Sequence, residues 1–315
     1  MNVKRELQNT STLNFCKSLL VDGVMSDKVK VGIVGFGNLG QFLVDQILTN
    51  KQVSNRFEIC FIWNRTSDKI TTYFKENPSF KTEWILEDLS KACTQFPSVQ
   101  MIVEVCHPSI IEQYGVQFLS HCDLFVGSPT AFANNKVEKD LRDLCNQCLH
   151  GCYIPSGALW GAQDIEKMAT LNSLKELTIT MKKHPSSLKL EPPLSEKLVN
   201  FEQWDDDKEY VIYEGPVREL CPLAPNNVNT MACAALAGHN LGFDKVKARL
   251  VADKRLEAHV IDIDVVGPGG DSCFRVVTQR INPAKAGAVT GNATYNSFLS
   301  SLLQAYGRGG GFHFC

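Results

Sequence analysis

The chain has 315 residues, of which 44% are hydrophobic and 21% charged, and its formal net charge is −2. This length favours two domains, and the near-neutral charge argues against a nucleic-acid-binding protein. No apolar run reaches the ~18 residues of a membrane span, and residues 1–28 lack the apolar core of a secretory signal. Glu6 and Asp22 count against the alternative of a mitochondrial presequence. We therefore expect a cytoplasmic globular protein with an N-terminal tail, residues 1–28.

The first ordered segment predicts a dinucleotide-binding turn. Residues 29–34 have the composition of a buried strand, and a helix is expected to run to about Asn50. Between them lies the motif Gly35-Phe36-Gly37-Asn38-Leu39-Gly40, which is G-x-G-x-x-G between the strand and helix that it requires. Glycines there permit a tight turn and a close approach of a pyrophosphate, and the helix N-terminus attracts the phosphates. The segment predicts binding of NAD or NADP.

A second strand, residues 57–65, indicates which dinucleotide is bound. An NAD site usually has an acidic residue at the end of this strand, where it accepts the ribose 2′-hydroxyl. Here the strand ends in Asn64 and Arg65, with no acid. The Arg65 guanidinium is suited to pair with a 2′-phosphate, so NADP is at least as favoured as NAD. The alternative is that Arg65 is a solvated loop residue.

Strands and helices continue to alternate up to about residue 155. Strands are expected over residues 99–108, 123–129 and 152–157, with helices over 108–122 and 133–151. This is the pattern of a doubly wound Rossmann domain, residues 29–155, whose ligands bind at the carboxyl ends of its strands. His107 lies at that edge and is a minor candidate for the nicotinamide side.

The segment "CNQCLHGC" places Cys145, Cys148, His150 and Cys152 close together. Two cysteines at this spacing can open a zinc site, but no second pair with matching spacing follows. At i, i+3 and i+7 the three cysteines would also share one apolar face of a helix, which is the favoured interpretation. No metal is expected.

From residue 156 to about 288 the pattern indicates a second domain of the α+β class, built on an open sheet. Strands are expected near 174–184, 245–253, 258–267 and 273–281, with an irregular polar insertion over 184–210. A helix near 293–306 is expected to return to the first domain, and 307–315 is expected to be a flexible tail. In the strand 258–267, His259 shares the apolar face of Ile261 and Ile263. That position suits either a buried core histidine or one directed at a substrate.

Several features occur together in one order along the chain. The Rossmann motif is followed by Ser156-Gly157-Ala158-Leu159, by Pro225-Asn226-Asn227-Val228-Asn229, and by Ala252-Asp253 with His259 six residues later. Over residues 30–303 this arrangement resembles the L-aspartate dehydrogenase family. The resemblance implies a homodimer that oxidatively deaminates L-aspartate to oxaloacetate and ammonia, or runs the reverse. It also implies His259 as the active-site residue and Ala158 and Asn229 as contacts of the nicotinamide.

The chain departs from the family pattern at three places. Glu257 stands where an asparagine is usual, Leu159-Trp160-Gly161 replaces smaller residues, and the polar insertion is longer. Two alternatives therefore stay open. One is another two-domain NADP oxidoreductase, of the dihydrodipicolinate reductase or homoserine dehydrogenase sort. The other is a catalytically silent NAD(P)-binding sensor.

An aspartate site would need cations for two carboxylates and a group that moves protons. An imidazole is suited to both proton transfers, which favours His259. Lys182, Lys183 and His184 end one strand and are candidates for the carboxylates, although a solvated strand end would explain them equally well. Asn227 is a further substrate candidate, and a helix cap would account for one of the two asparagines. His239 is expected only to end a helix, and Trp160 either to wall the pocket or to lie in the core.

Overall fold

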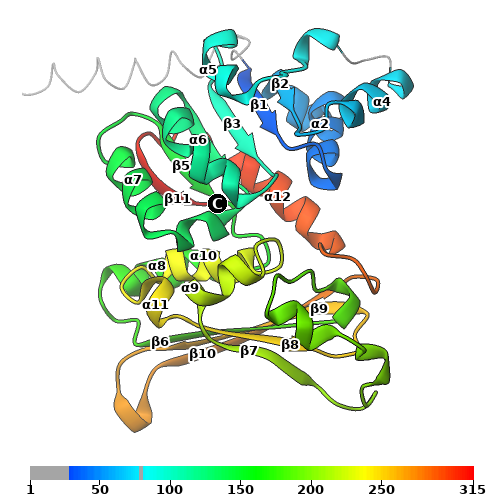
Figure 1. The fold of residues 1–315 in the computed structure, drawn as a ribbon. Coiled ribbons are helices and arrows are strands. Elements are labelled where there is room, and N and C mark those ends of the chain that lie inside the picture. Colours follow the sequence, from blue (N-terminus) through cyan, green and yellow to red (C-terminus); the bar gives the residue numbers. More distant parts are fainter. Residues whose placement is uncertain (1–27, 78–80) are drawn as a thin grey trace, which may run out of the picture.

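A computed structural model describes residues 28–77 and 81–315, which form two β-sheets with helices between and around them (Figure 1). The N-terminal tail expected over residues 1–28 lies outside the described residues except for Lys28. The predicted fold class is confirmed: a Rossmann domain precedes an α+β domain on an open sheet.

The first sheet is entirely parallel, in the order β11-β5-β4-β3-β1-β2. Its strands are buried by helices on both faces, which explains their continuous apolar sequences. The strands are β1 Val29–Val34, β2 Phe57–Trp63, β3 Met101–Glu104, β4 Asp123–Val126, β5 Gly151–Ile154 and β11 Gly311–Phe314.

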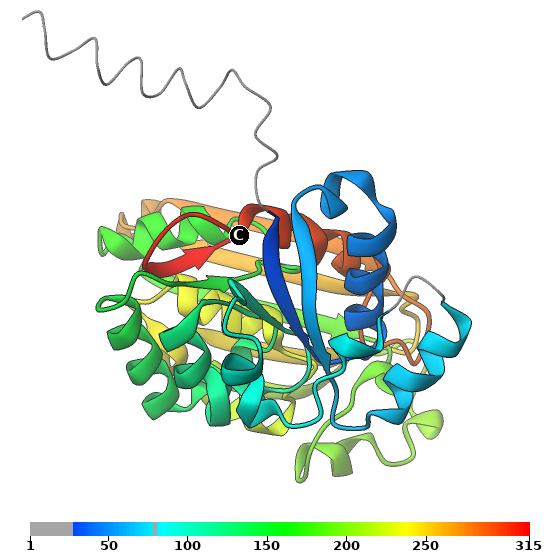
Figure 2. The ribbon, with the colours of Figure 1, turned by 90° about the horizontal axis from the view of Figure 1, so that it is seen from above.

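The two faces of this sheet have separate cores. On one face, α2 (Asn38–Thr49) and α12 (Asn292–Gln304) pack against apolar side chains of the strands. On the other, α6 (Pro108–His121) and α7 (Asn135–Cys145) do the same, and Figure 2 shows this layering from above. The helix near the C-terminus thus returns to the first sheet. Shorter helices complete the layer: α3 Lys51–Ser54, α4 Asp68–Glu76, α5 Ala92–Gln95, η1 Thr82–Trp84, η2 Leu89–Lys91 and η3 Pro129–Ala133.

The last segment of the chain corrects one prediction. Residues 311–314 are not a flexible tail but strand β11, which pairs in parallel with β5. The ring of Phe312 packs against that of Phe132 with centroids 5.3 Å apart, and the Arg142 guanidinium lies over it at 4.6 Å. These apolar contacts hold a segment whose glycine-rich composition had suggested a flexible tail.

The cysteine-rich segment also differs from its prediction. Helix α7 ends at Cys145, so Cys145, Cys148 and Cys152 do not share a helix face, and Cys152 belongs to β5. Cys145 and Cys152 are buried nonetheless. Within residues 28–77 and 81–315, no group of three or more His, Cys, Asp or Glu side chains is placed to hold a metal ion.

The second sheet is mixed, in the order β10-β9-β6-β8-β7. Its strands are β6 Glu176–Lys183, β7 Tyr210–Pro216, β8 Lys247–Ala252, β9 Ala258–Val266 and β10 Arg275–Pro283. Four helices lie between this sheet and the first domain, and the opposite face of the sheet is left open (Figure 1). They are α8 Ala162–Thr170, α9 Val217–Leu220, α10 Asn229–Ala237 and α11 Gly242–Lys245. His259 and Lys183 belong to the covered face, so the strand alternation decides which side chains reach the space between the domains.

The polar insertion is more ordered than expected. It forms the short helices η4 Pro185–Ser187, η5 Leu194–Leu198 and η6 Phe201–Gln203 before β7 begins at Tyr210. Two further single turns follow, η7 Cys221–Leu223 and η8 Gly270–Ser272. Within the described part of the chain, no helix has the length and apolarity needed to cross a bilayer.

Candidate active site

A cavity of about 670 Å³ lies between the carboxyl ends of the first sheet and the covered face of the second. Loops from both domains line it, which is where ligands of doubly wound folds bind. Its polar lining comprises Asn38, Ser128, Ser156, Lys183, Lys189, Asn226, Asn227, Asn229, Thr230, His259, Asn282, Thr290, Thr294 and Tyr295. No Asp or Glu is among the described lining residues, so the cavity favours an anionic ligand.

The glycine turn at one end of this cavity fits a pyrophosphate. Gly35 has φ +113°, a conformation that side chains disfavour, and a Cβ there would lie 2.8 Å from the Val105 carbonyl oxygen. Gly37 lines the cavity, and a Cβ built on it would meet nothing within 4 Å, so ligand atoms have room against the backbone. Helix α2 begins at Asn38 and directs its N-terminus at the same place.

The end of β2 supports this turn and contributes a cation. Asn64 Oδ1 accepts a hydrogen bond from Phe36 N at 3.1 Å, and Asn64 Nδ2 donates to Thr66 O at 2.9 Å. Arg65 is exposed and, among the described residues, has no ion-pair partner. Burial raises the pKa of Cys106 to about 11, and the nearby charge of Arg65 opposes this rise, which places Arg65 close to the edge of the cavity. The cation is thus available to a ligand.

Glu104 at the end of β3 ties together two loops of the cavity wall. Its Oε1 accepts hydrogen bonds from Cys106 N at 2.7 Å, His107 N at 3.0 Å and Ser128 Oγ at 2.9 Å, while Oε2 accepts from Ser128 N at 2.9 Å. Complete burial raises the pKa of Glu104 to about 7, although these four donors favour its ionised form. The sequence analysis missed this residue, whose only signal was an acid at the end of a buried strand.

His259 lies in the cavity wall and is only 5% exposed. Its Nε2 is 3.0 Å from the carbonyl oxygen of Ala288. Because a carbonyl can only accept, Nε2 carries the proton, and Nδ1 keeps a lone pair able to accept one. Burial and then the charge of Lys183 lower the pKa of His259 to about 4, against the hydrogen bond to Ala288. The imidazole is therefore neutral in the free protein near pH 7.

Lys183 is the buried cation of the same cavity, 4% exposed at the end of β6. Its Nζ donates to Asn227 O at 3.4 Å and to Val289 O at 3.3 Å. Burial lowers the pKa of Lys183 to about 8, and no carboxylate among the described residues forms an ion pair with it. A buried cation without an anionic partner suits a site that receives a negatively charged ligand.

The structure places the predicted carboxylate-binding residues differently from expectation. Lys182 Nζ lies 2.8 Å from Glu209 Oε1, and His184 caps η4 through its Nδ1, 2.7 Å from Ser186 Oγ. Neither lines the cavity, whereas Lys183 does. Side chains alternate across a strand, so Lys183 shares the covered face of Met181 and Lys182 points away. The sequence analysis did not use this alternation, which would have favoured Lys183 over Lys182.

Most of the predicted cofactor and active-site residues come together. One cavity is lined by Gly37, Asn38, Leu39, Ala158, Asn227, Asn229 and His259. The glycine turn at its end is formed and flanked by Gly35, Phe36, Gly40, Asn64 and Arg65. The two asparagines differ in their contacts. Both groups of the Asn227 amide are occupied, with Nδ2 donating to Ser187 O at 3.0 Å and Oδ1 accepting from Lys189 N at 2.9 Å. Asn229 Oδ1 accepts from Thr130 Oγ1 at 3.3 Å, which leaves its amide N–H groups for a ligand.

The remaining candidates lie outside this cavity. His107 caps α6, with Nδ1 2.9 Å from Ser109 Oγ, and His239 Nε2 lies 3.3 Å from Thr170 Oγ1 beyond the end of α10. Glu257 is exposed and is not part of the cavity lining. Trp160 is 69% exposed, so it does not lie in the core.

Comparison with known proteins identifies the family. A protein of Danio rerio named aspartate dehydrogenase domain-containing protein is 47% identical to this chain over 92% of this chain and 100% of that protein. The chain belongs to the aspartate dehydrogenase family. A Xenopus tropicalis protein of the same name is 44% identical over 91% of this chain and 98% of that protein. An archaeal L-aspartate dehydrogenase, from Methanosarcina mazei, is 28% identical over 79% of this chain and 87% of the enzyme.

Family models match both halves of this aspartate dehydrogenase family member. Residues 35–155 match "Homoserine dehydrogenase, NAD binding domain", and residues 164–301 match "Aspartate dehydrogenase, C-terminal". A crystal structure of aspartate dehydrogenase from Thermotoga maritima has the same fold, with a TM-score of 0.62 and 21% identity over 89% of this chain and 97% of that chain. The chain is an oxidoreductase of this family, and its cofactor is NAD or NADP.

Proposed function

We propose that this protein is an NAD(P)-dependent L-aspartate dehydrogenase. The observation that carries the proposal is the pairing of His259 with Lys183 in the cavity that also contains the glycine turn. A neutral imidazole and an unpaired buried cation beside a dinucleotide site are what oxidation of an anionic amino acid requires. The archaeal relatives named L-aspartate dehydrogenase support the choice of substrate.

The cavity has two lysine side chains that can bind the two carboxylates of aspartate. Lys183 is buried, and Lys189 is exposed on the same lining. We assign Lys183 to one carboxylate and Lys189 to the other, with Thr290 and Thr294 as hydroxyl donors of the lining. The arrival of two carboxylates would raise the pKa values of both His259 and Lys183, because negative charge favours their protonated forms.

The reaction converts L-aspartate, water and the oxidised cofactor to oxaloacetate, ammonium, the reduced cofactor and a proton. When bound, NAD(P)⁺ supplies the acceptor for the hydride that leaves Cα. Nδ1 of His259 accepts a proton from the substrate amine, so that nitrogen has a free electron pair when the Cα–H bond breaks. The imidazole passes that proton to solvent and then takes a proton from the water that attacks the resulting imine carbon. It returns this second proton to the amine, which leaves as ammonium when the carbonyl group of oxaloacetate forms. Nε2 stays bound to Ala288 O and holds the ring in place.

Two residues are proposed to orient the cofactor. Asn229 lines the cavity, and its amide N–H groups have no partner among the described residues, so they suit the nicotinamide carboxamide, beside Ala158. Arg65, without an ion-pair partner in the described chain, suits a 2′-phosphate and favours NADP over NAD.

Reduction of cofactor with L-aspartate, followed by absorbance at 340 nm, tests the proposal. We expect His259→Ala to lower turnover by about 10² or more while cofactor binding persists. Unchanged turnover would remove His259 from the mechanism. If the wild-type protein shows no turnover but is thermally stabilised by NADPH, it is instead a catalytically silent sensor.

We also propose that the protein is a homodimer formed through the open face of the second sheet. Val277 and Ile281 of β10 point to that face and are 62% and 63% exposed. Such apolar exposure on an edge strand is typical of an interface. Light scattering after size exclusion gives the mass directly, and Ile281→Glu should shift it toward the monomer.

A further inference from the structure

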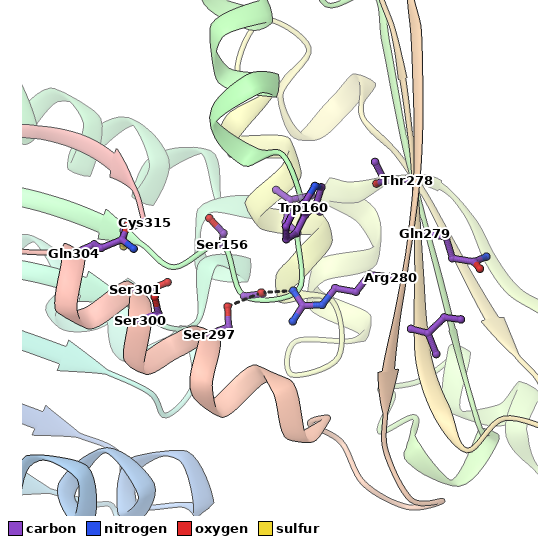
Figure 3. Close-up of a pocket in the computed structure, with 13 residues that line it drawn as sticks. Ser156, Trp160, Thr278, Gln279, Arg280, Ser297, Ser300, Ser301, Gln304 and Cys315 are labelled. Carbon is purple, nitrogen blue, oxygen red and sulfur yellow. Dashed lines mark hydrogen bonds between the residues drawn. The ribbon is translucent and has the colours of Figure 1, made fainter. Parts of the chain in front are cut away.

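A second cavity, of about 830 Å³, adjoins the first and is not used by the proposed reaction. We name it the Arg280 cavity. Four parts of the chain line it: the loop from Ser156 to Trp160, strand β10 at residues 278–281, one face of α12, and Cys315 (Figure 3). Ser156 and Gly157 line both cavities, so this loop is a shared wall between them.

Arg280 is a cation of this cavity without a counter-ion. Its Nη1 donates to Gly157 O at 2.9 Å, and no ion pair involves it among the described residues. Burial lowers the pKa of Arg280, with no opposing acid. A guanidinium has five N–H donors, so most of its donors remain for a ligand. Among the described residues that line the cavity there is no Asp or Glu.

Hydroxyl side chains line the same cavity as this cation. Ser297, Ser300, Ser301 and Gln304 recur at the spacing of one helix face on α12, opposite the buried Phe298 and Leu302. Ser297 Oγ donates to Gly157 O at 2.8 Å beside Arg280 (Figure 3). Thr278 lies on the same face of β10 as Arg280, and its Oγ1 is buried without a hydrogen-bond partner. A buried polar atom of this kind is normally satisfied, which points to a missing ligand or water.

We propose that the Arg280 cavity is a binding site for a small organic oxyanion. Arg280 and the hydroxyls of Thr278 and α12 hold its charged group, and the exposed ring of Trp160 covers its apolar body. A carboxylate and a phosphate share this chemistry. The site is separate from the aspartate cavity, where Lys183 and His259 lie.

Occupation of this site would act on cofactor binding through the shared loop. Gly157 has φ +57°, and Arg280 and Ser297 both donate to its carbonyl oxygen. An anion bound to the remaining donors of Arg280 offsets the positive charge of the guanidinium, which weakens its hydrogen bond to Gly157 O and loosens the loop that holds Ala158 against the cofactor. The anion and the cofactor therefore weaken each other's binding by the same factor. This inference depends on cofactor binding and not on the choice of aspartate as substrate.

Calorimetric titration of the full chain with inorganic phosphate and with benzoate tests the site. We expect at least one of them to bind, with an affinity reduced about tenfold or more in Arg280→Met. If only phosphate binds, the site recognises the charged group of its ligand. If only benzoate binds, the natural ligand is a carboxylate attached to a flat apolar group. Arg275→Met is the matched control, because Arg275 lies on the same strand but pairs with Asp264 at 2.6 Å on the open face. It should bind as the wild type does.

A second variant keeps the test valid if Arg280→Met does not fold. Ser300 is exposed on α12, so Ser300→Glu keeps the helix and places a carboxylate in the cavity, and it should also weaken anion binding about tenfold. Binding of neither probe, or equal binding to wild type, Arg280→Met and Ser300→Glu, overturns the proposal. A change of oligomeric state in Arg280→Met without anion binding assigns the cavity to a subunit contact and overturns it as well. Equal anion affinity with and without NADPH overturns the coupling.

Discussion

The ammonium of Lys183 and the imidazole of His259 share one buried cavity, and the charge of Lys183 helps to lower the pKa of His259. The two residues come from the neighbouring antiparallel strands β6 and β9. Lys182 pairs with Val260, and the adjoining residues on the two strands, Lys183 and His259, face the cavity together. This arrangement keeps the imidazole neutral and the amine charged near pH 7, as a base and an anion-binding cation must be. The pKa values of these two groups predict the direction in which ligand affinity and protein stability change with pH.

The affinity for succinate should fall as pH rises through about 8. Succinate has the two carboxylates of aspartate without its amine, so the titration reports the protein groups. Lys183 binds a carboxylate only when protonated, and its pKa in the free protein is about 8. Calorimetry across pH 6.5–9.5 measures the effect, with Lys183→Arg expected to keep high affinity throughout the range. A fall of the same size in Lys183→Arg would assign the pH dependence to another group.

The stability of the free protein should depend on His259 at acidic pH. Its folded pKa of about 4 lies below the ordinary 6.5, so the unfolded chain binds a proton in this window and the folded chain does not. Stability contributed by the neutral form is therefore present above about pH 6.5 and is lost as pH falls to about 4, by an amount of the order of 3 kcal/mol. Denaturant unfolding of wild type and His259→Gln at each pH measures the difference. Parallel curves would contradict the prediction.

The parts of the molecule that the sequence predicts are those set by local periodicity. The glycine turn before α2 and the strand that carries His259 follow from spacing within about ten residues. Strand β11 escaped prediction because its pairing with β5 joins Gly311 to Gly151, far apart in the chain. The hydrogen bonds from His259 to Ala288 and from Asn227 to Ser187 are long-range contacts of the same kind. The choice of Lys183 over Lys182 was local, however, and strict alternation along β6 would have given it.

Arg65→Ala should weaken binding of NADPH much more than binding of NADH. The guanidinium is exposed beside the turn and has no ion-pair partner in the described residues, so its loss removes a contact with the 2′-phosphate alone. A charge-assisted hydrogen bond of ~1.5–3 kcal/mol corresponds to about tenfold to a hundredfold in affinity. Fluorescence titration with each reduced cofactor measures it. Arg56→Ala, at an exposed position before β2, is the control, and equal losses for both cofactors in Arg65→Ala would exclude the 2′-phosphate role.

Glu104→Gln should destabilise the protein and loosen its cofactor site. The carboxylate of Glu104 accepts hydrogen bonds from the backbone N–H groups of Cys106, His107 and Ser128 and from the Ser128 hydroxyl. A glutamine of the same shape presents an NH₂ group to one set of these donors, which leaves buried N–H groups unpaired. We expect a loss of about 1–3 kcal/mol in the free energy of unfolding.

A matched control variant distinguishes the loss of the buried Glu104 carboxylate from the loss of an ordinary surface charge. Glu112→Gln on α6 is its control, since Glu112 is exposed and should change stability by less than about 0.5 kcal/mol. Because the loops held by Glu104 line the cofactor cavity at Cys106 and Ser128, the affinity for NAD(P)H should fall together with stability. Thermal unfolding with and without cofactor measures both quantities. A Glu104→Gln protein as stable as wild type would contradict the prediction.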